Sequence, residues 1–447
     1  MKRILLFLLM LAPFLSFAQE GPKSYEFSLK QAVDYAFVNQ SRVLNSQLDE
    51  DIARAKVKEI AGIGLPQVNA SFDVKDYLLL PTSLFPSDAF GGPKGTYVPV
   101  KFGLKYNATA GVDVSQLLFD GSYIVGLQST LVYMDLAKKA TERSKIETSI
   151  AVSKAYYNVL INEERIKLLD ANVERLKKLY DDTKALNENG FVEKIDVDRV
   201  SLNFNNVQVE REKVRRFLGL SYYLLKYQIG MEINADLKLS DKLSDSDFES
   251  LQLSDAPFDY TKRIEYSLLQ GQYKMNKLEL RKNRFLYLPT VVAYGSFASQ
   301  AQRDNFDVFA FGKNWYGVQL IGGKITLPIF DGLQKNYKIR QSKLAVAKAE
   351  NDLKNLMQSI EVDLRSATVT LQNSISSLKV QRENMKLAEE VYRVSKLKYD
   401  QGVGSNLEVV NAEALLKEAQ TNYYSALYDA YVAKIEMNRA SGTIKFQ

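Results

Sequence analysis

Apolar and polar residues alternate with period two along four segments of the chain, which predicts amphipathic strands. We expect two strand pairs, at residues 66–80/100–115 and 289–302/315–328. In the last segment the apolar phase changes between Leu320 and Ile321, which is typical of a bulge. Long strands with one apolar and one polar face fit a β-barrel between lipid and water, although a single such strand is more typical of a soluble sandwich.

Two long stretches contain neither glycine nor proline, the residues that most often interrupt helices. They run from Leu127 to Asn189 and from Leu333 to Gln401. Each would form a helix of roughly 100 Å, far longer than the helices of globular domains, so we expect antiparallel coiled-coil packing. A glycine-bearing turn and a further helical stretch follow each one, which predicts two long helical hairpins, at 120–230 and 333–441. Shorter stretches of this kind predict further helices, including one over residues 23–61.

The two halves of the chain resemble each other, which indicates an internal duplication. The matching segments are Leu65-Pro66 with Leu288-Pro289, Phe119-Asp120-Gly121 with Phe330-Asp331-Gly332, and Ile195-Asp196-Val197 with Leu407-Glu408-Val409. We therefore predict a first repeat at 19–235 and a second at 258–447, each with a helix, a strand pair and a long hairpin. Residues 236–257 are rich in Ser and Asp and are predicted to form an irregular equatorial connector. The fold class is mainly α with β.

The N-terminus has the features of a secretory signal peptide, predicted at residues 1–18. Lys2 and Arg3 precede an apolar run, and small residues stand where cleavage before Gln19 would require them. The apolar run is about 14 residues long, shorter than the roughly 20 that a membrane-spanning helix needs. We therefore expect export.

Composition argues against several functions. The chain has 59 basic and 53 acidic residues with no basic block, so no nucleic-acid partner is expected. It has no Cys and no His, which excludes Cys/His zinc sites and nucleophile–base pairs built from these residues. The Gly402-Val403-Gly404 segment lacks the third glycine and the preceding strand of a dinucleotide site. We predict no cofactor and no enzymatic activity.

The order and duplication of these elements resemble the TolC-like outer-membrane efflux family, over nearly all of the mature chain. The resemblance implies a homotrimer in the cell outer membrane that extends into the periplasm. Each protomer would give four strands to a trimeric twelve-stranded barrel in outer-membrane lipid, and its long helices to a periplasmic tunnel. The implied function is a passive exit duct of a tripartite efflux or type I secretion system, opened by a periplasmic adaptor and energised by an inner-membrane pump.

The resemblance also carries over a periplasmic gate. A family gate position falls on Tyr399, a family aspartate on Asp196, and two constriction aspartates on Glu408 and Asn411. The family's arginine partner is replaced by Gly404, so Lys194 is the candidate substitute. For Glu408, an exposed carboxylate that suits the start of a helix is an equally good explanation. The implied adaptor-docking tips are Asn189, Gly190, Gly402 and Gly404.

Two other functions compete with the channel. A structural coiled-coil protein of the periplasm, without a membrane barrel, is the main alternative, and the alternating strand at 100–115 argues against it. An enzyme comes third because no constellation of catalytic residues stands out.

Overall fold

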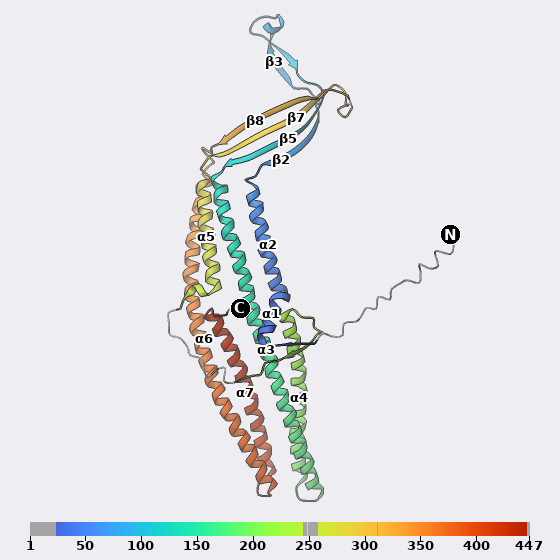
Figure 1. Cartoon of the computed structure of the whole chain (residues 1–447), viewed down its shortest axis with the longest axis vertical. Coiled ribbons are helices and arrows are strands. Elements are labelled where there is room, and N and C mark those ends of the chain that lie inside the picture. Colours follow the sequence, from blue (N-terminus) through green and yellow to red (C-terminus); the bar gives the residue numbers. More distant parts are fainter. Residues whose placement is uncertain (1–23, 245–247, 249–257, 311, 445–447) are drawn as a thin grey trace, which may run out of the picture. The chain divides into compact units, whose positions relative to one another are not determined.

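The computed structural model describes residues 24–244, 248, 258–310 and 312–444 (Figure 1). The predicted signal peptide lies outside these residues, as does most of the predicted connector. The described chain divides into two compact units. A helical unit draws on residues 1–47, 140–265 and 357–447, and a sheet unit on 48–139 and 266–356.

The sheet unit contains one antiparallel four-stranded sheet in the order β2-β5-β7-β8. Its strands are β2 (Gln67–Asp76), β5 (Tyr106–Phe119), β7 (Thr290–Arg303) and β8 (Tyr316–Thr326). Each half of the chain supplies one antiparallel pair, and the β5–β7 pairing joins the two pairs. The four predicted strands are thus present, and β2 and β8 form the two edges of the sheet.

One face of this sheet carries exposed apolar side chains from all four strands. The pairing register places them together; they are Val68, Phe72, Val112, Phe297, Ile321 and Ile325. On β2 and β5 the opposite face is polar, with Asn69, Asp73 and Asp113. This arrangement is the one expected of a sheet with lipid on one side and water on the other.

The predicted bulge in β8 is wrong. β7 and β8 pair in continuous register from Thr290–Thr326 to Gln300–Tyr316, so the change of phase places apolar residues on both faces of β8. The register shift in the sheet lies instead between Leu117 and Phe119 of β5.

The strand predicted to begin at residue 100 begins at Tyr106. Val100 and Lys101 end a separate strand, β4 (Tyr97–Lys101), which pairs with β3 (Thr82–Pro86) across the short 3-10 helix η1 (Ser87–Phe90). Gly103 separates the two strands with φ of 100°, a backbone conformation that a side chain makes costly. The alternation of apolar residues continues across this break, so the sequence pattern alone did not reveal it.

The two very long helices are confirmed. They are α3 (Gly121–Glu188), with 68 residues, and α6 (Gln334–Asp400), with 67 residues. Each follows a strand exit, where Asp120 accepts a hydrogen bond from the Tyr123 amide and Asp331 accepts one from the Lys335 amide. The repeated Phe-Asp-Gly motif therefore begins both helices, because the aspartate pairs an amide that the first helical turn leaves free.

The returning helices of the hairpins are α4 (Lys194–Ile229) and α7 (Asn406–Ala440). The other helices are α5 (Ile264–Phe285), preceded by the 3-10 helix η3 (Tyr260–Lys262), α1 (Leu29–Asn39) and α2 (Ser41–Gly62). Among the described residues, every helix falls short of the combination of length and apolar character that crossing a membrane requires.

The single helix predicted over 23–61 is wrong in two places. Residues 24–27 form β1 (Ser24–Phe27), which pairs in parallel with β6 (Asp236–Leu239). Helices α1 and α2 are separated at Gln40, whose ψ of 123° is extended. Neither break involves glycine or proline, so the stretch looked uninterrupted. Because β6 is an ordered strand, the predicted connector is not irregular at its start.

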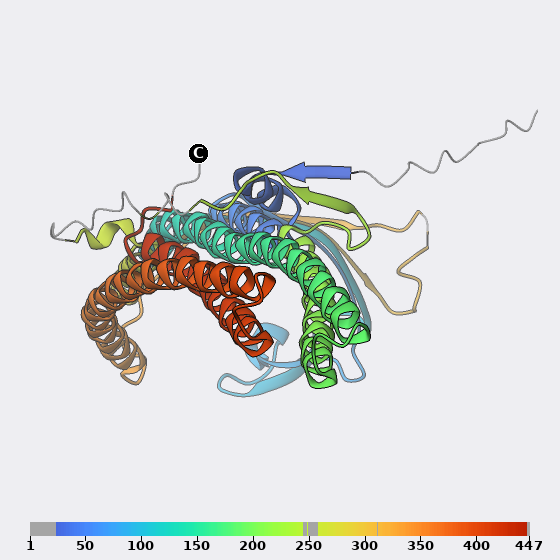
Figure 2. The same cartoon turned by 90° about the horizontal axis from the view of Figure 1, so that it is seen from below.

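The core of the helical unit includes a cluster in which α3, α4 and α7 meet, with Tyr392 of α6. Figure 2 shows the two hairpins from the end at which their turns lie. The buried residues of α4 in this cluster repeat every seven positions: Val200, Val207 and Val214. Helix α7 contributes Val409, Ala412 and Leu416. The turns at the hairpin tips are therefore held by helices packed along their length.

Candidate functional site

The turns at the two hairpin tips have the same backbone geometry. Gly190 and Gly402 have φ of 78° and 75°, the left-handed conformation that glycine adopts without strain. The Gly190 amide donates to Asn187 and the Phe191 amide to Leu186, both at 2.9 Å. In the second turn the Gly402 amide donates to Tyr399 and the Val403 amide to Lys398. Both tips are Schellman motifs, which confirms that these two glycines are left-handed.

The residue after each left-handed glycine is apolar and exposed. Phe191 is 77% exposed and Val403 is 76% exposed. In most Schellman motifs this residue packs back onto the preceding helix. Here both tips instead present an apolar side chain to the outside, at equivalent positions of the two repeats.

Position 404 requires glycine for a different reason from position 402. Its φ is not positive, but a Cβ added there would lie 2.9 Å from the Cβ of Lys398 and 3.0 Å from the Tyr399 amide nitrogen. The missing side chain allows the chain to pass the end of α6 before Ser405 begins α7. The Ser405 hydroxyl then accepts a hydrogen bond from the Glu408 amide at 3.2 Å and caps that helix.

The gate candidates on α6 and α7 differ in their surroundings. Glu408 and Asn411 lie on the exposed face of α7, whereas Val409 and Ala412, the residues that directly follow them, are buried in the core cluster. Tyr399 is half-buried against that cluster, with the Lys396 ammonium 5.5 Å from its ring centroid. Its hydroxyl is buried and has no hydrogen-bond partner in the described part of this protomer.

The gate candidates on α4 are not joined to the others within the described protomer. Asp196 lies in the first turn of α4 and pairs with Arg199, with 3.6 Å between the charged atoms. Lys194 is exposed and makes no ion pair with the described residues. The neighbour of Asp196 is therefore Arg199, which sequence reasoning did not select although it stands one helical turn away.

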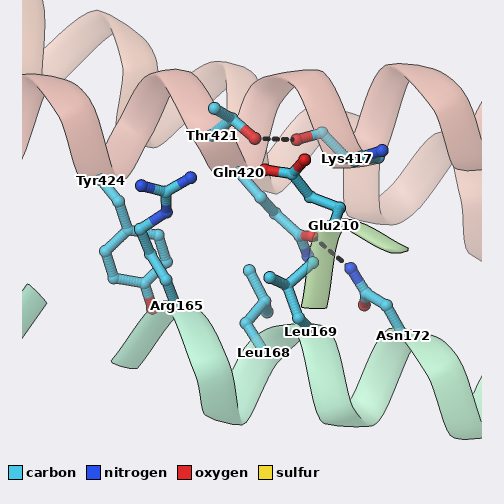
Figure 3. A pocket seen from close by; sticks show the side chains of 9 residues that line it. All are labelled: Arg165, Leu168, Leu169, Asn172, Glu210, Lys417, Gln420, Thr421 and Tyr424. Carbon is cyan, nitrogen blue, oxygen red and sulfur yellow. Dashed lines mark hydrogen bonds between the residues drawn. The ribbon is translucent and has the colours of Figure 1, made fainter. Parts of the chain in front are cut away.

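Sequence reasoning also missed a column of buried polar residues on α7. Asn406, Glu413 and Gln420 recur every seven positions, and all three are buried. Gln420 accepts a hydrogen bond of 3.0 Å from the Asn172 amide of α3, as Figure 3 shows. Glu413 is 1% exposed, and neither of its carboxylate oxygens has a hydrogen-bond partner among the described residues. The seven-residue spacing was visible in the sequence but was not sought.

The charges around Glu413 come from α3 and from α7 itself. The Arg175 guanidinium of α3 lies 3.6 Å from Glu413 and 4.9 Å from the ring centroid of Tyr392. Burial raises the pKa of the Glu413 carboxyl, while Arg175 and Lys417 oppose the rise. Burial likewise raises the pKa of Tyr392 to about 12, and Glu413 adds to that rise. Within the described residues, no group of three or more acidic side chains is arranged to hold a metal ion.

A cavity of about 20 Å³ lies next to this column, between α3, α4 and α7 (Figure 3). Its charged lining side chains are Arg165, Glu210 and Lys417. The volume is sufficient for about one water molecule. Nothing in this lining resembles an enzyme's arrangement of nucleophile, base and charge-stabilising donors.

Comparison with known proteins finds similarity to outer membrane efflux proteins. Residues 261–443 match the family model described as "Outer membrane efflux protein". The chain is 22% identical to the outer membrane protein TolC of Vibrio cholerae, over 76% of this chain and 77% of that protein. The chain is similar to TolC-like outer-membrane efflux proteins, and its residues 261–443 match their family model.

Two further similarities cover almost the whole chain. It is 22% identical to the antibiotic efflux pump outer membrane protein ArpC of Pseudomonas putida, over 96% of this chain and 90% of that protein. The structure of the CmeC outer membrane channel of Campylobacter jejuni superimposes with a TM-score of 0.73 and 16% identity, over 93% of this chain and 85% of that one. The fold of the chain is therefore that of this outer membrane channel.

Proposed function

We propose that this protein is the outer-membrane channel of a tripartite efflux or type I secretion system. It would act as a passive exit duct, located in the outer membrane and extending into the periplasm. One observation carries the proposal: a single chain combines a sheet with a continuous exposed apolar face and two helical hairpins with first helices of 68 and 67 residues. The sheet suits lipid, and a helix of this length spans roughly 100 Å.

The two edges of the sheet support a homotrimer. β2 and β8 each have a partner on one side only, which leaves a row of backbone groups that cannot remain unpaired in lipid. β2 has 10 residues and β8 has 11, so the β8 of one protomer matches the β2 of the next in length. We propose that three protomers close the sheet in this way into a barrel of twelve strands.

The exposed surfaces of the helical unit support the same assembly. Helix α4 exposes apolar side chains along its length: Leu202, Val209, Phe217, Leu220, Leu224 and Tyr227. Helix α6 exposes Val362, Val369, Val380, Leu387 and Val391. The apolar surface of α4 and that of α6 are two different patches of the same protomer. If α4 of one protomer packs against α6 of the next, the contact is head-to-tail, and contacts of this kind can close into a ring.

We place the gate at the periplasmic end of the hairpins. Glu408 and Asn411 occupy the exposed face of α7 and are free to line the pore of a trimer. Tyr399, Asp196 and Lys194 complete the proposed gate. Threefold symmetry would make Glu408 a ring of three carboxylates, which attracts cations into a narrow pore. Asn411 is neutral, so the ring carries one acidic residue per protomer where the family has two.

We propose that the hairpin tips dock a periplasmic adaptor, which links the channel to an inner-membrane pump. The docking positions are Asn189, Gly190, Gly402 and Gly404. The exposed Phe191 and Val403 add two apolar anchors at equivalent places. Exposed apolar side chains contribute to binding in proportion to the apolar area that a partner removes from water.

Native mass measurement in mild detergent tests the assembly. We expect a trimer, because in a smaller assembly the backbone groups at the edges of β2 and β8 would have no hydrogen-bond partners in lipid. A monomer or a dimer at this step would contradict the proposed barrel closure.

Planar-bilayer recording tests the gate. Glu408→Gln should lower the preference for cations and the block by divalent ions, since the acidic ring would be lost. Asp49→Gln is the control, because Asp49 is an exposed carboxylate on α2 outside the proposed gate. If Glu408→Gln has unchanged selectivity at low salt, where screening is weakest, Glu408 does not line the constriction.

A further inference from the structure

The buried face of α7 changes in character along its length. Near the turn its seven-residue column is Asn406, Glu413 and Gln420, and the next member of the column is Leu427. Beyond Gln420 the buried residues of α7 are apolar, from Ala426 and Leu427 to Ala440. The polar part of the column is therefore confined to the half of α7 nearest the tip.

The three polar residues are satisfied to different degrees. Gln420 is paired with Asn172. Both side-chain polar atoms of Asn406 lack a hydrogen-bond partner within the described chain, as do both oxygens of Glu413. A buried polar group without a partner costs free energy, and a buried charge costs more. The buried polar atoms of α7 that lack a partner therefore lie between Gln420 and the tip.

Glu413 is the most costly of the three when it is charged. Its single ion pair, with Arg175, is longer than a hydrogen bond, and Arg175 also donates a hydrogen bond to Asn172. The other titratable groups that face it are Tyr392 on α6 and Lys417 on α7, while Glu210 of α4 lines the neighbouring cavity with Lys417. One partly exposed arginine at this distance compensates incompletely for the loss of hydration.

We propose that the charge of Glu413 controls whether the tip half of α7 packs against α3. The charged form favours separation of residues 406–420 from α3, and the protonated form favours packing. Separation exposes the carboxylate to water, whereas Leu427 and the apolar residues beyond it stay packed. The consequence for channel opening rests on the proposed function, but the effect on packing does not.

The direction of the pH dependence follows from burial. Because packing raises the pKa of Glu413, the packed form binds a proton more strongly than the separated form. Packing is therefore most favoured below the ordinary glutamate pKa of about 4.3, and it weakens as the pH rises through the raised value. Each unit of that rise changes the packing equilibrium about tenfold.

Hydrogen exchange of the purified full-length protein, followed by mass spectrometry on peptides from 406–420, tests the proposal. Wild type and Glu413→Gln are compared at equal pH, which cancels the chemical pH dependence of exchange. At pH about 8 we expect exchange in wild type to be faster by roughly tenfold for each unit of raised pKa. At pH about 4, near the ordinary carboxyl value, the two rates should converge. Glu418→Gln, an exposed carboxylate on the same helix, should match wild type throughout.

A second pair of variants separates the charge from the packing. Arg175→Gln should accelerate exchange at pH about 8, because it removes the cation that faces Glu413. Adding Glu413→Gln to it should restore slow exchange. Equal rates for wild type and Glu413→Gln at high pH, or acceleration by Arg175→Gln that the second change does not reverse, would overturn the proposal. Neither result bears on conductance or trimer mass, which test the channel function separately.

Discussion

The returning helices α4 and α7 occupy equivalent places in the two repeats but differ in the polar residues that they bury near the tip. Toward the tip α4 buries Val200, Val207 and Val214, with Ser221 beyond them, whereas α7 buries Asn406 and Glu413 beside Val409, Ala412 and Leu416. The turns that precede them share one backbone geometry. The two tips therefore share one turn geometry, but the helices that follow the turns bury different residues near the tip. We expect α7 to be the more mobile of these two helices.

The largest expected effect comes from giving α4 the buried charge that α7 has. Val207→Glu should destabilise the helical unit by about 3 kcal/mol or more, because Val207 is 1% exposed and a carboxylate buried there loses its hydration. The apparent melting temperature, followed by circular dichroism, measures the loss. Asn205→Glu places the same charge on an exposed position of α4 and should change little. Equal effects of the two variants would show that the valine column is not buried in solution.

The converse change removes the buried charge from α7. Glu413→Leu should stabilise the protein by about 1–2 kcal/mol, since an apolar side chain of similar size avoids the cost of burying a carboxylate. Thermal unfolding at neutral pH measures the gain, with Glu418→Leu as the exposed control. A lower melting temperature for Glu413→Leu would mean that the pair with Arg175 is stabilising and that the contrast between the helices is smaller than inferred.

The shared turns should respond alike. Gly190→Val and Gly402→Val each place a branched side chain at a left-handed φ, at a cost of about 1–2 kcal/mol. Trimer yield and membrane insertion should remain normal, because neither turn belongs to the sheet or to the apolar surfaces of α4 and α6 that the proposed trimer buries, while export should fall. Gly219→Ala, in the interior of α4 with open space around it, is the control. Normal export in both valine variants would show that the turns do not dock a partner.

The smallest effect concerns helix capping, where the hairpins differ again. Ser405 caps α7 through its hydroxyl, whereas Glu193 at the start of α4 makes no side-chain capping bond. Ser405→Ala should therefore cost about 1 kcal/mol, and Glu193→Ala close to nothing. Melting curves of the two variants distinguish the outcomes, and a matching loss in both would contradict the assigned cap.

Some site residues were predictable and others were not, for physical reasons. The tip glycines were predictable because long tracts without glycine or proline end at them, and a left-handed helix end selects glycine. The repeat brought Glu408 and Asp196 into view as matched positions. Arg175 was not predictable, since it stands on α3 in a long charged helix and becomes distinctive only because Glu413 faces it. The exposure of Phe191 was not predictable either, because it depends on whether the preceding helix packs against its side chain in the folded turn.

The sequence by itself determined the elements that depend on local chemistry. Tracts without glycine or proline account for most of the length of α3 and all of α6, the Phe-Asp-Gly motifs set their starts, and period-two alternation set the four strands apart from the break at Gly103. Tertiary structure decided what depends on distant partners. The β5–β7 pairing joins two halves of the chain far apart in sequence, and Gln40 ends a helix without any breaking residue. Gln420 accepts a hydrogen bond from Asn172, whereas the Glu413 oxygens have no hydrogen-bond partner among the described residues. This difference depends on how α7 packs against α3, because burial and pairing are set by neighbouring helices and not by the sequence of one helix.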